Sequence, residues 1–186
     1  MAIESARYRV VSKEGKFEIR EYEGYILAEV EVQGDYDHAI NTGFRILADF
    51  IFGNNKRRTR IKMTAPVTET TAGQPEKIEM TAPVSAISSE GGRYTIAFVM
   101  PSKYNLDTLP QPNSREIGFR KVDASTAAVI RFPGYLKKRL AEEKAEELKN
   151  WLKKRNLTAK SPFASAQYNP PWIIGPFRKN EIIVTV

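Results

Sequence analysis

The fold of this chain is decided by the stretch Ile26-Leu27-Ala28-Glu29-Val30-Glu31-Val32 and by its flanks. Its apolar residues fall on one face at every second position, which is typical of a half-buried β-strand. The preceding segment Phe17–Tyr22 alternates in the same way, and Gly24 separates the two runs. From His38 to Phe52, apolar residues recur at helical spacing. We therefore expect two strands followed by a helix.

The same order of elements returns about one hundred residues later. Ala128–Phe132 resembles the opening stretch, Gly134 takes the place of Gly34, and a second helix is expected from Tyr135 to Asn156. A Pro-containing extended segment follows each helix, at residues 60–67 and 168–174, and each half then adds a further strand, expected at Lys77–Val84 and Glu181–Val186. We expect a mostly antiparallel sheet or open barrel with one helix per half packed on its outside.

A repeated pentapeptide supports an internal duplication. Met-Thr-Ala-Pro-Val stands at residues 63–67 and again at residues 80–84. We expect one domain over residues 1–186, built from pseudo-repeats at about 8–90 and 91–186. Two related halves leave a concave face between them, and this is where we expect a ligand.

Composition excludes several classes of function. The 186 residues carry a net charge of +7. They include no cysteine, and this absence excludes disulfides, thiolate metal sites and a cysteine nucleophile. No run approaches the roughly 18 apolar residues of a membrane span. The first residues, Met1–Arg7, do not read as a secretory signal, so we expect a cytoplasmic protein.

The basic residues gather in two short runs, Lys56–Arg60 and Lys153–Arg155. Neither run has interleaved aromatic residues or belongs to a nucleic-acid-binding motif, so we expect a solvated surface and no nucleic-acid partner. The sequence also lacks a nucleophile elbow, a phosphate-binding loop and a dinucleotide fingerprint. These absences favour a binding protein over an enzyme.

Few residues could ligate a metal. His38 is the only histidine, so it is either a surface residue of the first helical turn or a lone axial ligand to haem iron. Met63, Met80 and Met100 lie in expected strands close to prolines. Their thioethers could line a flat apolar site or ligate haem iron, and they could equally fill the core.

Three aromatic residues and one acidic residue are further candidates for a binding site. Phe44, Tyr168 and Trp172 could form walls of an apolar pocket, or they could be plain core. Glu181 begins the final strand, where it could hold a cationic ligand, act as a general base, or pair with a cation such as Arg178.

Five segments together resemble the SOUL haem-binding protein family, over nearly the whole chain from about Tyr8 to Val186. They are Asp37–Phe44, Phe50–Asn54, Lys62–Val67, Tyr168–Pro171 and Arg178–Glu181. The resemblance implies an α+β fold in which duplicated β-α-β units form a distorted eight-stranded antiparallel barrel with two flanking helices. It is similar to the effector-binding domains of bacterial regulators.

The resemblance also implies non-enzymatic binding of haem or a related tetrapyrrole, as carrier, buffer or sensor. The apolar groove would lie by the first helix, with basic groups near the propionates. The residues that we assign to this site are His38 as the candidate iron ligand, with Phe44, Leu47, Ala48, Lys62, Met63, Met80, Tyr168, Trp172, Ile173, Arg178 and Glu181.

Two other functions fit the same scaffold. One is a small-molecule effector-binding domain in which Glu181 and Trp172 grip a cationic or aromatic ligand. The other is a hydrolase-like enzyme with Glu181 as its base. In each case the partner is a flat or small molecule. The oligomeric state stays open, with a monomer favoured.

Overall fold

The structure is a computed structural model that describes residues 5–56, 78, 84–89, 91–169 and 173–186. Its elements follow one another as β1 (Tyr8–Glu14), β2 (Phe17–Tyr22), β3 (Tyr25–Gln33), α1 (Tyr36–Ile51), β4 (Asn55–Lys56), β5 (Val84–Ser89), β6 (Arg93–Val99), β7 (Gln111–Pro112), β8 (Gly118–Val122), β9 (Ser125–Phe132), α2 (Lys138–Lys154), β10 (Ala164–Gln167), a short 3₁₀ turn η1 (Gly175–Phe177) and β11 (Asn180–Thr185).

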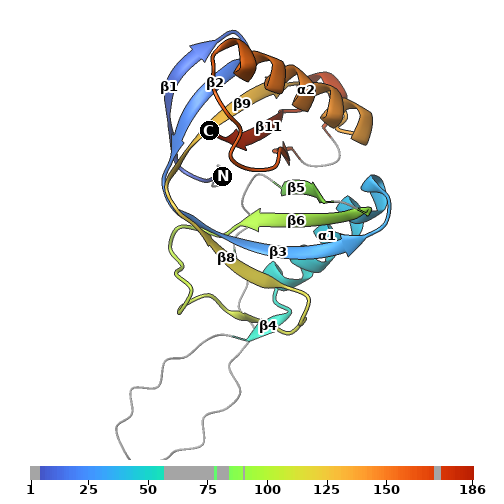
Figure 1. Cartoon of the computed structure of the whole chain (residues 1–186). Helices are drawn as coiled ribbons and strands as arrows, with labels where there is room; N and C mark the ends of the chain where they lie inside the picture. The colour runs from blue at the N-terminus through green and yellow to red at the C-terminus, as the bar shows by residue number, and fades with distance from the viewer. Residues whose placement is uncertain (1–4, 57–77, 79–83, 90, 170–172) are drawn as a thin grey trace, which may run out of the picture.

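One curled sheet dominates the molecule (Figure 1). Its nine strands run in the order β1-β2-β9-β11-β10-β5-β6-β3-β8, and the adjacent pairs are antiparallel. The expected α+β fold with a curled antiparallel, barrel-like sheet and two flanking helices is confirmed. The sheet has nine strands instead of eight and stays open as a half-barrel, with β1 and β8 at its two edges.

The strand order has a symmetry centred on the β5–β10 pair. From this pair outward, one side reads β10, β11, β9, β2 and the other reads β5, β6, β3, β8. On each side the strand before the helix lies third from the centre: β3 lies between β6 and β8, and β9 lies between β11 and β2. Among the described residues β1 has no counterpart on the other side, which accounts for the ninth strand.

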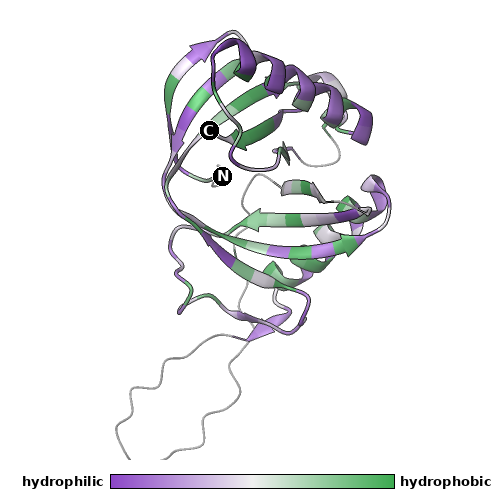
Figure 2. Ribbon diagram, in the orientation of Figure 1, coloured by the Kyte–Doolittle hydropathy of each residue, from purple (hydrophilic) through white to green (hydrophobic). Residues whose placement is uncertain are grey.

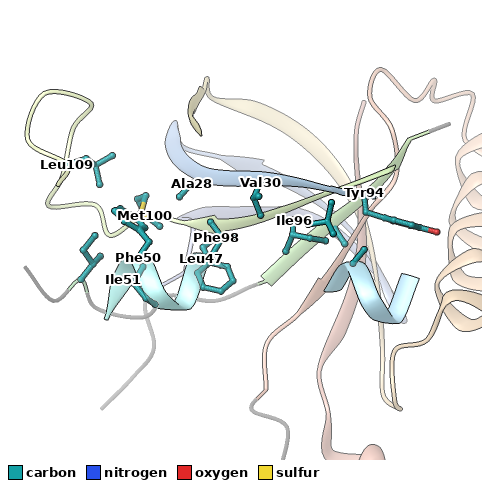
Figure 3. Packing of buried hydrophobic residues seen from close by; sticks show 14 of the residues in the cluster. Ala28, Val30, Leu47, Phe50, Ile51, Tyr94, Ile96, Phe98, Met100 and Leu109 are labelled. Carbon is teal, nitrogen blue, oxygen red and sulfur yellow. The ribbon is translucent and has the colours of Figure 1, made fainter. Parts of the chain in front are cut away.

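Each helix covers one half of the convex face of the sheet. α1 packs on β3 and β6, and α2 packs on β9 and β11. Under α1 lies a cluster that includes Leu47, Phe50, Ile96 and Phe98 (Figure 3). A second cluster under α2 contains Leu148 and other buried residues. Figure 2 shows that the outer side of α2 is largely hydrophilic, as expected for a helix with one buried stripe.

Local chemistry explains the path of α1. The Asp35 side chain caps the helix by accepting a hydrogen bond from the amide of His38 at 2.9 Å. A glycine within the helix allows the close contact with the sheet, because a Cβ on Gly43 would lie 2.4 Å from Cγ1 of Ile96. After the helix, Gly53 adopts a φ of 123°, a conformation that side chains rarely allow.

Several elements differ from the sequence-based expectation. The sequence does not indicate β1 because its residues are exposed on both faces and show no useful alternation. β5 begins where the expected strand Lys77–Val84 ends, and β10 comes just before the expected extended segment 168–174. α2 begins at Lys138 instead of Tyr135, because Gly134 turns the chain with a φ of 113° and Lys137 is still extended.

Candidate functional site

The concave face of the sheet encloses a cavity of about 350 Å³. This volume falls in the lower part of the roughly 300–1,000 Å³ that small-molecule sites occupy. Its walls come from both halves of the sheet and are mainly apolar, with Leu27, Ile87, Ala97, Val99, Val122, Ala127, Ala164 and Ile183 among them. Four tyrosines also line it: Tyr8, Tyr22, Tyr25 and Tyr168.

Strand alternation creates this cavity. On β3 the side chain of Leu27 faces the cavity, whereas its neighbour Ala28 belongs to the cluster under α1. Ala97, Ala127 and Ala164 bring small side chains to the concave face from three different strands. A curled sheet whose inner face carries alanines cannot fill its own concavity, so a hollow remains.

A buried ionic network lies beside the tyrosines. The guanidinium of Arg20, which is fully buried, donates from Nη1 and Nη2 to the two carboxylate oxygens of Glu181 at 2.9 and 2.8 Å. Its Nε donates to Glu18 at 2.8 Å. Arg131 is the second cation, with its Nη1 3.3 Å from Glu18 and its Nε 3.6 Å from Glu181. Two carboxylates are therefore balanced by two guanidinium groups.

Hydrogen bonds tie two of the cavity tyrosines to this network. The hydroxyl of Tyr168 donates to Oε2 of Glu181 at 2.5 Å, and the hydroxyl of Tyr22 accepts from Nη1 of Arg20 at 3.0 Å. The ring of Tyr8 lies over the same guanidinium, with its centroid 4.2 Å from Cζ. The tyrosines thus form a lining between the cavity and the buried charges.

Contacts within the network shift the pKa values of several of its members. Burial alone would lower the pKa of Arg20, but its hydrogen bonds to Glu181 raise that pKa above the ordinary value. Burial alone would raise the pKa of Glu18, but the hydrogen bond and charge of Arg20, with help from Arg131, hold it below the usual value. Burial and the negative charge of Glu181 raise the pKa of Tyr168. At neutral pH Arg20 and Glu18 stay charged and Tyr168 stays a phenol.

The structure separates the residues that the sequence assigns to one site. Tyr168 lines the concave cavity, and Glu181 lies directly behind it in the ionic network. Phe44, Leu47 and Ala48 lie on α1, which packs on the opposite face of the sheet. There Phe44 packs edge-on against Phe98 with ring centroids 5.5 Å apart.

The other assigned residues are at the surface or outside the described residues. His38 is exposed, and its Nε2 lies 3.5 Å from the hydroxyl of Thr42. Ile173 and Arg178 are half-buried, and Nε of Arg178 donates to the carbonyl of Ile173 at 2.7 Å. The remaining four, Lys62, Met63, Met80 and Trp172, lie outside the described residues.

The residues that line this cavity show whether it suits a haem, both as walls and as possible iron ligands. Its apolar walls and tyrosine rings match a flat apolar plate, but its lining contains no histidine and no methionine among the described residues. Tyrosine can ligate haem iron as a phenolate, yet burial raises the pKa of both Tyr22 and Tyr168 and both hydroxyls are already hydrogen-bonded. The apolar walls therefore suit an apolar ligand, and neither the Tyr22 nor the Tyr168 hydroxyl is free to ligate iron. In the described part of the chain, no group of three or more His, Asp or Glu residues is placed to bind a metal ion.

Sequence reasoning misses the residue at the centre of the network. Glu181 is singled out, but its partner is Arg20, 161 residues earlier. The available signal was the second face of Phe17–Tyr22, where Glu18, Arg20 and Tyr22 occupy alternate positions. That face is the buried concave one, with Glu18 3% exposed and Arg20 fully buried.

Known proteins resemble this chain in sequence. It matches the family model of the SOUL heme-binding protein over residues 3–74 and 69–185. Heme-binding protein 2 of Mus musculus is 29% identical over 170 residues, which cover 90% of this chain and 77% of that protein. Heme-binding protein 2 of Homo sapiens is 30% identical over 159 residues, covering 84% and 72% respectively.

Solved structures resemble it in fold. The C-terminal domain of EcmrR has a TM-score of 0.64 at 10% identity and covers 96% of each chain. A hydrolase from Listeria innocua has a TM-score of 0.56 at 10% identity, covering 94% of this chain and 93% of that one. At such low identity these two structures show the shared fold only. The match of the family model over almost the whole sequence is decisive: the chain belongs to the SOUL heme-binding protein family.

Proposed function

We propose that this protein binds haem or a related flat tetrapyrrole in the concave cavity, without catalysing a reaction, and serves as a carrier, buffer or sensor. The observation that carries the proposal is the cavity of about 350 Å³ with mainly apolar walls and four tyrosines. Membership of the family and the names of the two relatives support haem as the ligand. Among the residues that the structure describes, neither helix has the length and hydrophobicity to cross a bilayer.

Burial of the plate would supply most of the affinity. Each Å² of apolar surface removed from water contributes about 25 cal/mol, and the cavity walls offer such surface from both halves of the sheet. Leu27, Val99 and Ile183 would contact the faces of the macrocycle, since their side chains line the cavity. Affinity that comes from burial and not from a strong axial bond suits a protein that must release its ligand.

A cation at the cavity wall would meet a propionate. Arg120 lines the cavity and is half-exposed, and its contact with Glu29 uses Nε at 3.0 Å from Oε2. The terminal Nη groups of the same guanidinium would then donate to a carboxylate as charge-assisted hydrogen bonds. This assignment orients the ligand with its apolar edge inward and its propionates at the wall of Arg120.

The geometry around Glu181 disfavours the two alternative functions. Both of its carboxylate oxygens accept hydrogen bonds from Arg20, and one also accepts from Tyr168. A carboxylate that grips a cationic ligand, or acts as a base, must offer an oxygen toward the cavity. Here Arg20 and Tyr168 occupy those oxygens, so we assign Glu181 a structural role.

We also propose that the fold arose by duplication. The support is the matched strand order on the two sides of the β5–β10 pair, with one helix on each side. In this scheme β6 corresponds to β11, because β6 pairs with β3 as β11 pairs with β9. We therefore place the boundary between the halves after Val99 and not at residue 90. The repeated pentapeptide lies outside the described residues, apart from Val84 at the start of β5.

A hemin titration followed by absorbance tests the binding proposal. The parent protein should give a saturable change in the Soret band. Ala164→Phe fills the cavity from a partly exposed strand and should weaken binding at least tenfold, with circular dichroism confirming the fold. The matched control is His38→Ala, which should bind normally because His38 lies on the surface of α1. Normal binding by Ala164→Phe would contradict the placement, and no binding by the parent would contradict the function.

A further inference from the structure

Three large apolar side chains stand out at one end of the molecule. Tyr135, Ile174 and Phe177 are 56%, 58% and 72% exposed. Tyr135 lies in the loop between β9 and α2, and the other two flank and end the η1 turn. Phe177 has the largest exposed fraction of the large hydrophobic side chains in the described residues.

The two loops that carry these side chains are held together by specific contacts. The amide of Gly134 donates to the carbonyl of Gly175 at 2.9 Å, and Nδ2 of Asn180 donates to the carbonyl of Gly134 at 2.8 Å. Gly175 also packs under the aromatic ring, because a Cβ there would lie 2.8 Å from Cε2 of Tyr135. The exposed residues therefore belong to one built surface and not to two separate loose loops.

Basic side chains adjoin this apolar group. The guanidinium of Arg178 lies over the ring of Tyr135, with Cζ 4.6 Å from the centroid. Arg178 and Lys179 line a groove of about 270 Å³ together with Lys16 and Arg131. No acidic residue is among the groove's lining residues in the described structure. Arg178 and Lys179 directly follow Phe177 in the chain, so they are the cations most closely associated with the apolar tips.

We propose that this surface, formed by Tyr135, Ile174, Phe177, Arg178 and Lys179, docks the protein on an anionic lipid membrane. Apolar tips beside cations fit a bilayer interface, where side chains enter the acyl boundary and lysines meet lipid phosphates. Tyrosine suits that depth because its ring is apolar and its hydroxyl is wet. The net charge of +7 draws the protein to the same kind of surface.

Flotation with lipid vesicles tests this proposal, which is independent of the ligand in the concave cavity. The full chain should float with phosphatidylcholine vesicles that contain phosphatidylglycerol, and hardly with phosphatidylcholine alone. Phe177→Ser should weaken binding about tenfold, since a large apolar side chain no longer enters the bilayer. Val11→Ser is the matched control, because Val11 is 48% exposed on the β1 edge, away from this surface.

The charge of the surface is tested separately. Lys179→Glu should weaken flotation at least tenfold and flatten its salt dependence, whereas Lys121→Glu, at an exposed position of β8, should not. Inorganic phosphate should compete no better than chloride at equal ionic strength. Preferential competition by phosphate would overturn the proposal in favour of a free-anion site. Equal binding to neutral and anionic vesicles, or none to either, would also overturn it and leave an acidic protein as the alternative partner.

Discussion

Arg20 and Glu181 form a two-pronged ion pair across the strand β9, which lies between their own strands β2 and β11. The pair joins the start of the chain to its last strand. Glu18, Arg131 and Lys13 extend it into a group of two carboxylates and three cations behind the concave cavity. Removing one member should therefore leave a buried charge without its partner.

Replacing Arg20 tests how strongly the network stabilises the fold. In Arg20→Met, two buried carboxylates lose their main cation, and we expect the free energy of unfolding to fall by about 3–5 kcal/mol. Urea unfolding followed by circular dichroism measures this change. Arg120→Met is the control, because the half-exposed pair of Arg120 with Glu29 should contribute less than about 1 kcal/mol. Equal losses in the two variants would show that burial of the network does not matter.

Acid should weaken the same network. The pKa of Glu18 in the folded protein is below its ordinary value, so its contribution is complete above the unfolded pKa of about 4.3. That contribution is lost as the pH falls through the lower folded pKa. We expect Glu18→Gln to be less stable at pH 7 and to lose less further stability between about pH 5 and 3. Urea midpoints across this range measure how steeply stability depends on pH. An unchanged pH dependence in Glu18→Gln would contradict the role of Glu18 in the network. Glu31→Gln, on the exposed side of β3, is the matched control.

Gly43 should resist a substitution that normally favours helices. Alanine in a helix interior is usually about 1 kcal/mol better than glycine, but a Cβ here would lie 2.4 Å from Ile96. We expect Gly43→Ala to lower the free energy of unfolding by about 1–3 kcal/mol through overpacking. Gly118→Ala, whose Cβ would meet nothing within 4 Å, should change it little. A more stable Gly43→Ala would mean that α1 and β6 are farther apart than described.

Arg120 should strengthen binding only of ligands that carry free carboxylates. Arg120→Gln should bind protoporphyrin IX about five- to tenfold more weakly than the parent, because a charge-assisted hydrogen bond is lost. It should bind the dimethyl ester of the same porphyrin as well as the parent does, since the ester has no carboxylate. Fluorescence titration with both porphyrins measures this. A similar loss for both would indicate that Arg120 shapes the cavity and does not bind a propionate.

Periodicity predicted most of the fold. The strand expected at Phe17–Tyr22 has the same bounds in the structure, and the first helix, expected at 38–52, spans Tyr36–Ile51. In both elements the apolar residues face a core cluster between sheet and helix, so the pattern of apolar residues locates them. β1 and β10 have weak patterns and become strands through pairing with their neighbours. β10 pairs with β5 from a distant part of the chain, and β1 pairs with the β2 strand that directly follows it; neither pairing leaves a signal in the residues of the strand itself.

The location of the candidate site was harder to predict from the sequence than the fold was. The sequence favours Phe44 and Leu47 as ligand walls because they are apolar, but the same property places them under α1. The cavity instead exists where side chains are small, such as Ala97 and Ala127, and absent volume has no signature in a sequence. The likeness to a haem-binding family indicated the ligand class without locating the cavity.

The location of the bound porphyrin is the most direct test of the central claim. Methyl NMR with a diamagnetic gallium protoporphyrin reads ring-current shifts on both faces of the sheet. We expect large shifts for Leu27, Val99 and Ile183 in the concave cavity, and unchanged signals for Leu47 and Ile51 under α1. The reverse pattern, with shifts confined to the α1 side, would contradict this claim.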